Sequence, residues 1–141
     1  MSTERQALSK GMVVAVSLRR FGTLLQHVGI VTDWDWQGQA WVISNSLARR
    51  GVVEEPLADF AAEQPVKILG YFGTLTPEAV VQRARSRRGD QWKLFSWNCE
   101  HFVRWAHGIE PASPQLTAGV AVMGTIALIA FAAFGPGTAS G

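Results

Sequence analysis

The stretch that organises the chain is residues 96–105, Ser-Trp-Asn-Cys-Glu-His-Phe-Val-Arg-Trp, which contains the only cysteine of the sequence. It predicts a helix, because Asn98 is a favoured N-cap residue, Glu100 suits the helix dipole in the first turn, and Gly108 offers a left-handed stop. Cys99 then lies in the first turn, where unpaired backbone N–H groups and the positive end of the dipole lower the pKa of a thiol. The stretch therefore predicts a nucleophilic sulfur.

The same cysteine has a second interpretation. Cys99, Phe102, Val103 and Ala106 follow the spacing i, i+3, i+4, i+7, which turns one face of the helix inward. A lone cysteine is also often a small buried hydrophobe. Local features leave both interpretations open, and a catalytic sulfur needs a base from another part of the chain.

Three histidines are available as that base. His101 and His107 lie two and eight positions after Cys99 on the same helix, so neither shares its i+3 or i+4 face. His27 stands at the start of a separate predicted strand, where a histidine on its own is more often structural. Cys99, His101 and His107 fit none of the usual zinc-ligand spacings, so we expect no metal and no cofactor.

The sequence of residues 98–103, Asn-Cys-Glu-His-Phe-Val, resembles that of the lecithin:retinol acyltransferase-like (LRAT domain) family. Further similarity, with Pro77-Glu78 and residues 83–86 before this core and Trp105 after it, runs from about Gly11 to Gln115. The family includes small phospholipase/acyltransferases and is similar to a circularly permuted papain-like thiol hydrolase, in which a strand with the catalytic histidine precedes the helix with the cysteine. The resemblance implies that Cys99 is the nucleophile and that His27 is its base.

The third catalytic residue is where this sequence departs from the family. A second histidine usually follows a Val-Ile pair on the next strand, but Val42-Ile43 is followed here by Ser44 and Asn45. An asparagine can accept the imidazole N–H, as in papain-like proteases, and a serine hydroxyl can do so more weakly. We favour Asn45 as the orienting residue, with Ser44 as the direct positional match.

These residues predict a thiol-dependent acyltransferase or phospholipase A-type hydrolase that acts on lipid esters through an acyl-cysteine. Its base either takes the proton of Cys99 or holds a thiolate already formed, and backbone N–H groups near the helix start stabilise the oxyanion. Two alternatives remain open. One is a papain-like peptidase or amidase, and the other is a decayed site that leaves a membrane-tethered binding module.

Length and composition agree with one catalytic domain. The chain has 141 residues, a net charge of +2 and a pI near 9.1, which does not by itself argue for nucleic acid. The content of six tryptophans departs further from an average composition than the net charge does, and tryptophan favours membrane interfaces as well as protein cores. A single cysteine excludes an intrachain disulfide, and residues 1–10 are polar without a signal-peptide core, so we expect a reducing, cytoplasmic environment.

The C-terminal part has a different character. Residues 116–134 are apolar or small and uncharged, a length that just spans a hydrocarbon core as a transmembrane helix. Its glycines and threonines also suit a buried helix or an oligomer contact. We expect a polar segment 1–10, a catalytic domain 11–115, a single-pass anchor 116–134 that keeps the domain cytoplasmic, and a short tail 135–141, with oligomeric state left open.

The remaining pattern predicts an α+β fold, a small antiparallel sheet packed with helices. The expected strands are 12–18, 26–32, 40–45, 51–55 and 65–71, with a loop at 19–23, a hairpin connection at 33–39 and a helical turn at 57–62. A second helix runs from Pro77 to Arg88, capped by Thr76 and ended by Gly89. Its arginines, at positions 83, 85, 87 and 88, form either a solvated face or a contact with anionic lipid headgroups.

Overall fold

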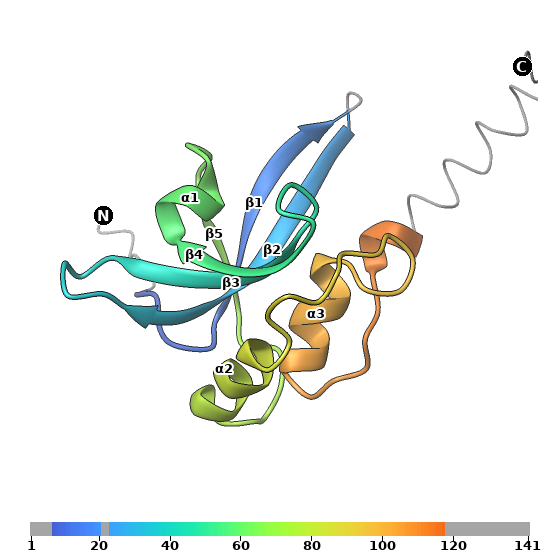
Figure 1. The fold of residues 1–141 in the computed structure, drawn as a ribbon. Coiled ribbons are helices and arrows are strands. Elements are labelled where there is room, and N and C mark those ends of the chain that lie inside the picture. The colour runs from blue at the N-terminus through green and yellow to red at the C-terminus, as the bar shows by residue number, and fades with distance from the viewer. Residues whose placement is uncertain (1–6, 21–22, 118–141) are drawn as a thin grey trace, which may run out of the picture.

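The sheet at the centre of the molecule has five antiparallel strands in the order β4-β3-β2-β1-β5 (Figure 1). The structure, a computed structural model, describes residues 7–20 and 23–117. The strands are β1 (Val13–Arg20), β2 (Thr23–Trp34), β3 (Ala40–Ser46), β4 (Gly51–Pro56) and β5 (Lys67–Gly70), and the helices are α1 (Leu57–Ala61), α2 (Pro77–Arg85) and α3 (Cys99–Ala106). The predicted antiparallel α+β architecture is confirmed.

The two faces of the sheet bury different helices, because successive side chains of a strand point to opposite faces. We call them the α3 face and the α1 face. The buried cluster on the α3 face consists of Val13, Ala15, Val28, Ile30, Ile43, Val52, Val80, Ala84, Phe102, Val103 and Ala106. The cluster on the α1 face consists of Val14, Val16, Val31, Val42, Phe60 and Ala61. Figure 1 shows α1 on one side of the sheet and α2 and α3 together on the other.

The strand predictions are confirmed in number and in order along the chain, but the loop predicted at 19–23 is wrong at residues 19, 20 and 23, and residues 21–22 lie outside the described residues. β1 and β2 continue into it and pair as far as Arg20 and Thr23. The hairpin connection at 33–39 holds: Asp35 Oδ1 accepts hydrogen bonds from the backbone N–H groups of Gln37 and Gln39, and Gly38 has a φ of 78°. β2 is therefore a long central strand that positions residues at both of its ends.

The helix ends follow the predicted caps. Thr76 Oγ1 accepts a hydrogen bond from the N–H of Ala79, and Pro77 occupies the first position of α2. The helix ends at Arg85, three residues earlier than predicted, and a turn then leads to Gly89, which has a φ of 89°. Gly108, with a φ of 73°, follows α3 as expected.

Gly29 allows a close approach between β2, β3 and α1. A Cβ atom at this position would lie 2.5 Å from Val42 Cγ1, 2.9 Å from Phe60 Cε2 and 3.1 Å from the carbonyl oxygen of Ile43. These distances are too short for a methyl group, because the neighbours belong to a packed core.

Gly29→Ala should therefore destabilise the protein by about 1–3 kcal/mol through overpacking. Urea unfolding of the two proteins measures this difference. Gly38→Ala is a poor control because of its positive φ, whereas Gln91→Ala, at an exposed position away from this contact, should leave the stability unchanged. Equal stability of Gly29→Ala and the wild type would contradict the close packing.

The predicted membrane anchor at residues 116–134 lies almost wholly outside the described residues, as does the tail at 135–141. Within residues 7–20 and 23–117, no helix has both the length and the apolar character needed to cross a membrane.

Candidate active site

Cys99 is the first residue of α3, and its position is fixed by the residue before it. Asn98 Oδ1 accepts hydrogen bonds from the N–H groups of Glu100 and His101, so the predicted N-cap is confirmed. His101 Nδ1 in turn accepts the N–H of Asn98 at 3.2 Å, which completes a capping box. The side chain of Cys99 thus leaves a well-capped helix end toward the sheet.

The sulfur of Cys99 lies against the main chain of β2. Its Sγ is 3.9 Å from the carbonyl oxygen of Gln26, and the N–H of Val28 also faces it. Because the carbonyl of Gln26 and the N–H of Val28 flank His27, the sulfur touches the backbone on both sides of the predicted base.

Burial raises the pKa of the Cys99 thiol to about 11, against the lowered pKa that its place on the helix predicts. Loss of solvent is the largest cause, and the neighbouring Glu100 carboxylate raises the pKa further. The N–H groups of Val28, Glu100 and Cys99 itself act in the opposite direction without offsetting burial. The resting sulfur is therefore a thiol, and the expectation of an intrinsically lowered pKa is wrong.

β3 pairs with β2 from Ile30 to Trp34, so among the described strands none pairs with the edge of β2 beside Cys99 on that side. Another residue fills this edge. The N–H of Gln26 donates to Gln115 Oε1 at 2.6 Å, and Gln115 Nε2 donates to the carbonyl oxygen of Gln26 at 2.8 Å. The Gln115 amide therefore replaces a neighbouring strand next to the sulfur.

Glu100 holds the segment that brings Gln115 to this place. Its Oε1 accepts hydrogen bonds from the Ser113 hydroxyl and, at 3.1 Å, from the N–H of Gln115. The sequence suggested a role for Glu100 only in the helix dipole and none for Gln115. No sequence signal identified Gln115, because its partners lie 15 and 89 positions away.

Gln115→Ala should lower the free energy of unfolding by about 1–3 kcal/mol, because two part-buried backbone groups of Gln26 lose their partner. It should also raise the amide hydrogen-exchange rate of Gln26. Gln91→Ala, at an exposed position, is the matched control and should change neither quantity. Unchanged exchange at Gln26 in Gln115→Ala would mean that this amide does not cover the edge of β2.

His27 is held on the α1 face. Its Nε2 lies 3.3 Å from Ser44 Oγ, and its ring packs on Phe60 with 4.9 Å between the ring centroids. Burial lowers its pKa to about 4, so the resting imidazole is neutral. With Nε2 beside Ser44, Nδ1 is the nitrogen left to face another group.

His27 and Cys99 meet the same edge of β2 from different faces. His27 is paired with Val16, a member of the cluster on the α1 face, whereas Cys99 packs against the cluster on the α3 face. In the described residues Cys99 Sγ donates to the carbonyl oxygen of Gln26, and the His27 ring contacts the Ser44 hydroxyl. The structure brings the two residues to adjoining positions without a hydrogen bond between them.

Ser44, and not the favoured Asn45, contacts His27. Asn45 Nδ2 donates to the carbonyl oxygen of Trp97 at 2.6 Å on the α3 face, and its buried Oδ1 has no hydrogen-bond partner within residues 7–20 and 23–117. The reason is strand alternation, which sends neighbouring residues of β3 to opposite faces. The contact with His27 is therefore made by Ser44, and the side chain of Asn45 contacts Trp97 instead.

The other two histidines have separate contacts. His101 belongs to the capping box, and His107 Nε2 lies 2.8 Å from the carbonyl oxygen of Gly11. Burial lowers the pKa of both. Among the residues that the structure describes, no three histidine, cysteine or acidic side chains gather in a group that would bind a metal ion.

The lowered pKa values of these histidines make stability depend on pH. The pKa of His27 is about 4 in the folded protein and about 6.5 in an unfolded chain, so between these values the unfolded state binds more protons. Stability should therefore rise with pH over this window, and His27 alone should cost on the order of 2 kcal/mol between pH 7 and pH 5. Urea unfolding at both pH values tests this.

The matched variant for this measurement is His27→Gln, which cannot titrate. It should lose clearly less stability on acidification than the wild type, with the remainder due to His101 and His107. Equal losses in the two proteins would show that His27 is not buried in the neutral form.

Comparison with known families assigns the chain to one of them. The chain matches the family described as Lecithin retinol acyltransferase over residues 10–108, more than two thirds of its length. A comparison with curated proteins found no match. The matched range includes both Cys99 and His27, and the family suggests chemistry of the acyltransferase or thiol hydrolase type. The chain belongs to the lecithin retinol acyltransferase family.

Proposed function

We propose that the protein transfers or hydrolyses the acyl group of a lipid ester at a membrane surface, through an acyl-cysteine on Cys99. The observation that supports this most is the position of the sulfur, which lies at the start of α3 against the main chain on both sides of His27. A nucleophile, a neutral imidazole and a residue that orients the imidazole are thus within one small region, as cysteine-dependent acyl transfer requires.

The proton moves during the attack rather than before it. Because burial keeps Cys99 as a thiol and His27 as a neutral imidazole, no ion pair forms at rest. The mechanism requires His27 Nδ1 and the Cys99 sulfur, which share no hydrogen bond in the described part of the chain, to approach one another when substrate binds, since catalytic hydrogen bonds often tighten only then. Ser44 Oγ accepts the Nε2 proton and holds this tautomer.

In the acylation step, the sulfur forms a bond to the ester carbonyl carbon while Nδ1 of His27 takes the thiol proton. Collapse of the tetrahedral intermediate breaks the bond to the alcohol oxygen, which leaves with that proton. Water or a second alcohol or amine then attacks the thioester, gives its proton to His27, and releases the sulfur, which recovers the proton. The products are an acid or a new ester or amide.

The oxyanion needs a donor that the helix cap has not used. The N–H groups of Glu100 and His101 already bond Asn98 Oδ1, whereas the N–H of Cys99 faces its own sulfur. We assign the N–H of Cys99 to the oxyanion. The sequence predicted that several backbone N–H groups near the helix start stabilise the oxyanion, whereas this assignment gives the role to one N–H group.

Exposed aromatic side chains support action at a membrane. Trp36, at the hairpin between β2 and β3, is 92% exposed, and Phe95, in the loop before Cys99, is 70% exposed. Large apolar side chains at exposed positions suit contact with a lipid surface. The proposed location, with the catalytic domain on the cytoplasmic side of a C-terminal anchor, follows from the apolar residues 116–134 and the basic residues before them.

A second candidate is a binding module without catalysis, and the raised pKa of Cys99 is the observation that favours it. The peptidase alternative has one supporting feature less, because Asn45 donates to Trp97 and the contact with His27 is made by Ser44. The three functions predict different results when the protein is incubated with lipid and with peptide.

The test incubates the full chain with phosphatidylcholine vesicles, with and without a primary amine as acceptor, and separately with peptide substrates. Release of fatty acid, or formation of an acyl amide, that disappears in Cys99→Ser supports the proposal. Peptide cleavage without lipid turnover would favour the peptidase. Lipid binding with no turnover, equal in the wild type and Cys99→Ser, would favour the binding module.

A further inference from the structure

The side-chain amide of Gln115 has an N–H that the contact with β2 does not use. Its Nε2 carries two hydrogens, and one of them is donated to the carbonyl oxygen of Gln26 at 2.8 Å. Its Oε1 accepts the N–H of the same residue at 2.6 Å. Within residues 7–20 and 23–117, Nε2 donates to no other group. The second N–H is therefore available to a ligand.

The pairing with Gln26 fixes the direction of this second N–H. The N–H of Gln26 needs an acceptor and its carbonyl needs a donor, so Oε1 lies beside the nitrogen of Gln26 and Nε2 beside its carbonyl oxygen. The line from Oε1 to Nε2 thus runs along β2 toward Val28. Because an amide group is planar, the hydrogen that does not bond Gln26 points away from Oε1 and in that same direction.

The sulfur of Cys99 lies where this N–H points. Its Sγ donates to the carbonyl oxygen of Gln26 at 3.9 Å and also faces the N–H of Val28. Sγ and Nε2 share one acceptor, so they lie closer together than the sum of their two distances to it, since two donors approach a carbonyl oxygen along different lone pairs. A tetrahedral oxyanion is two bonds from the sulfur and needs donors at about 2.7–3.1 Å. An oxyanion formed on Cys99 is therefore in the range of Nε2.

The amide of Gln115 is held in place before a substrate arrives, as an oxyanion donor has to be. Glu100 Oε1 accepts the N–H of Gln115 at 3.1 Å and also accepts the hydroxyl of Ser113. The N–H of Leu116 donates to Ser113 Oγ at 3.2 Å, which closes the turn around Gln115. The carboxylate of the residue after Cys99 therefore positions this amide.

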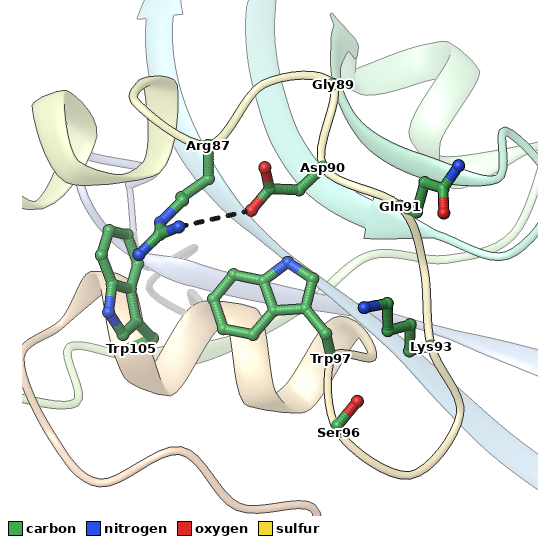
Figure 2. Close-up of a pocket in the computed structure, with 8 residues that line it drawn as sticks. All are labelled: Arg87, Gly89, Asp90, Gln91, Lys93, Ser96, Trp97 and Trp105. Carbon is green, nitrogen blue, oxygen red and sulfur yellow. Dashed lines mark ion pairs between the residues drawn. The ribbon is translucent and has the colours of Figure 1, made fainter.

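The backbone N–H of Cys99, the oxyanion donor assigned above, is fixed from the other end by Trp97. Figure 2 shows Trp97 on the segment that leads into α3, with its indole near the side chains of Arg87 and Trp105. The two indoles pack edge to face, with 5.9 Å between the ring centroids. The carbonyl oxygen of Trp97 accepts Asn45 Nδ2 at 2.6 Å, which ties the segment to β3. Both donors are thus oriented by the fold itself.

We propose that Gln115 is a second oxyanion donor, whose free Nε2–H binds the carbonyl oxygen of the acyl group together with the N–H of Cys99. The inference rests on the proposed function, because it adds a group to the acylation of Cys99. As the sulfur forms its bond to the carbonyl carbon, the π electrons move onto the oxygen, where the two N–H groups stabilise the charge. Collapse returns these electrons to the carbonyl and expels the alcohol, and Gln115 itself transfers no proton.

Gln115→Leu, which removes the amide, should lower kcat for ester turnover by about 10²-fold. KM should change little, because the lost donor acts on charge that develops only in the transition state. Gln82→Leu makes the same change at an exposed position of α2 and is the matched control, so both constants should stay unchanged. Equal kcat values for Gln115→Leu and the wild type would overturn the proposal.

A spectroscopic measurement separates this role from the support that Gln115 gives to β2. The full chain is acylated with p-nitrophenyl octanoate labelled with carbon-13 at the carbonyl carbon, and the infrared band of the thioester carbonyl is recorded. A hydrogen bond to the oxygen weakens the C=O bond, so the band should lie at lower frequency in the wild type and Gln82→Leu than in Gln115→Leu. The same frequency in all three proteins would mean that the amide does not touch the acyl oxygen.

A measurement on the wild type alone does not depend on the folding of any variant. In protein labelled with nitrogen-15, acylation should move the NMR signal of the free Nε2 hydrogen of Gln115 downfield. The hydrogen that bonds Gln26 should keep its position. A free hydrogen whose signal stays where it was before acylation would overturn the proposal.

Failure of this inference and failure of the proposed function give different results. If the activated ester acylates Cys99 and the carbonyl band depends on Gln115 while no lipid ester is turned over, the donor role stands and the lipid function fails. If lipid is turned over through an acyl-cysteine whose band and kcat do not depend on Gln115, the function stands and the donor role fails. A Cys99 that even the activated ester leaves unmodified overturns both.

Discussion

Alkylation of native Cys99 by iodoacetamide should accelerate about tenfold for each pH unit and continue to rise past pH 10. The reason is the buried thiol, whose pKa of about 11 leaves little thiolate at neutral pH. Relative to an ordinary thiol with a pKa near 8.5, the thiolate fraction at pH 7 is lower by about 300-fold. The sequence has a single cysteine, so the incorporated label reports this residue alone.

The same chain in urea provides the control. Unfolded Cys99 should titrate normally, and its alkylation rate should level off above about pH 9. A native profile that is already flat below pH 7 would show a resting thiolate paired with His27, which contradicts the neutral pair described here. A native profile identical to that in urea would contradict the burial of the sulfur.

His27→Ala should reduce kcat for lipid-ester turnover by about 10²–10⁴, the usual contribution of a general base. The reduction should appear in kcat with little change in KM, because the imidazole acts on the thiol proton and does not hold the lipid. Turnover by the wild type should also fall as pH decreases toward 4, where the imidazole becomes protonated.

Ser44→Ala is the companion variant. It removes the 3.3 Å partner of Nε2 but keeps the imidazole, so it should cost less than His27→Ala while leaving the fold intact by circular dichroism. Asn45→Ala separates the two candidate orienting residues, because its contact is with Trp97. The comparison is of kcat for lipid-ester turnover. If Asn45→Ala lowered kcat as much as Ser44→Ala without changing the free energy of unfolding, the assignment of the orienting role to Ser44 would be wrong.

The sequence predicts the local structure around the site well, because helix ends depend on neighbouring residues. Thr76 and Asn98 cap their helices as expected, and Gly89 and Gly108 follow them with positive φ. The strands follow from β-branched runs. The family match over residues 10–108 agrees with the resemblance seen in the residues around Cys99.

The sequence does not predict which side chains meet at the site, because those contacts depend on strand register and burial. Ser44 and Asn45 are adjacent in sequence, and only the alternation of β3 sends one toward His27 and the other toward Trp97. The lowered thiol pKa expected from the helix end was wrong for the same reason, since the sequence does not show how deeply the sulfur is buried. Gln115 reaches Gln26 through a non-local contact that no motif marks.

The most direct test of acyl-cysteine chemistry is the intact mass of the protein after a brief incubation with phosphatidylcholine and an acid quench. We predict a mass increase equal to one fatty acid minus one water, located on Cys99, removed by hydroxylamine and absent in Cys99→Ser. His27→Ala should form the same adduct far more slowly. An unmodified Cys99 in wild-type protein that turns over the lipid would contradict the mechanism.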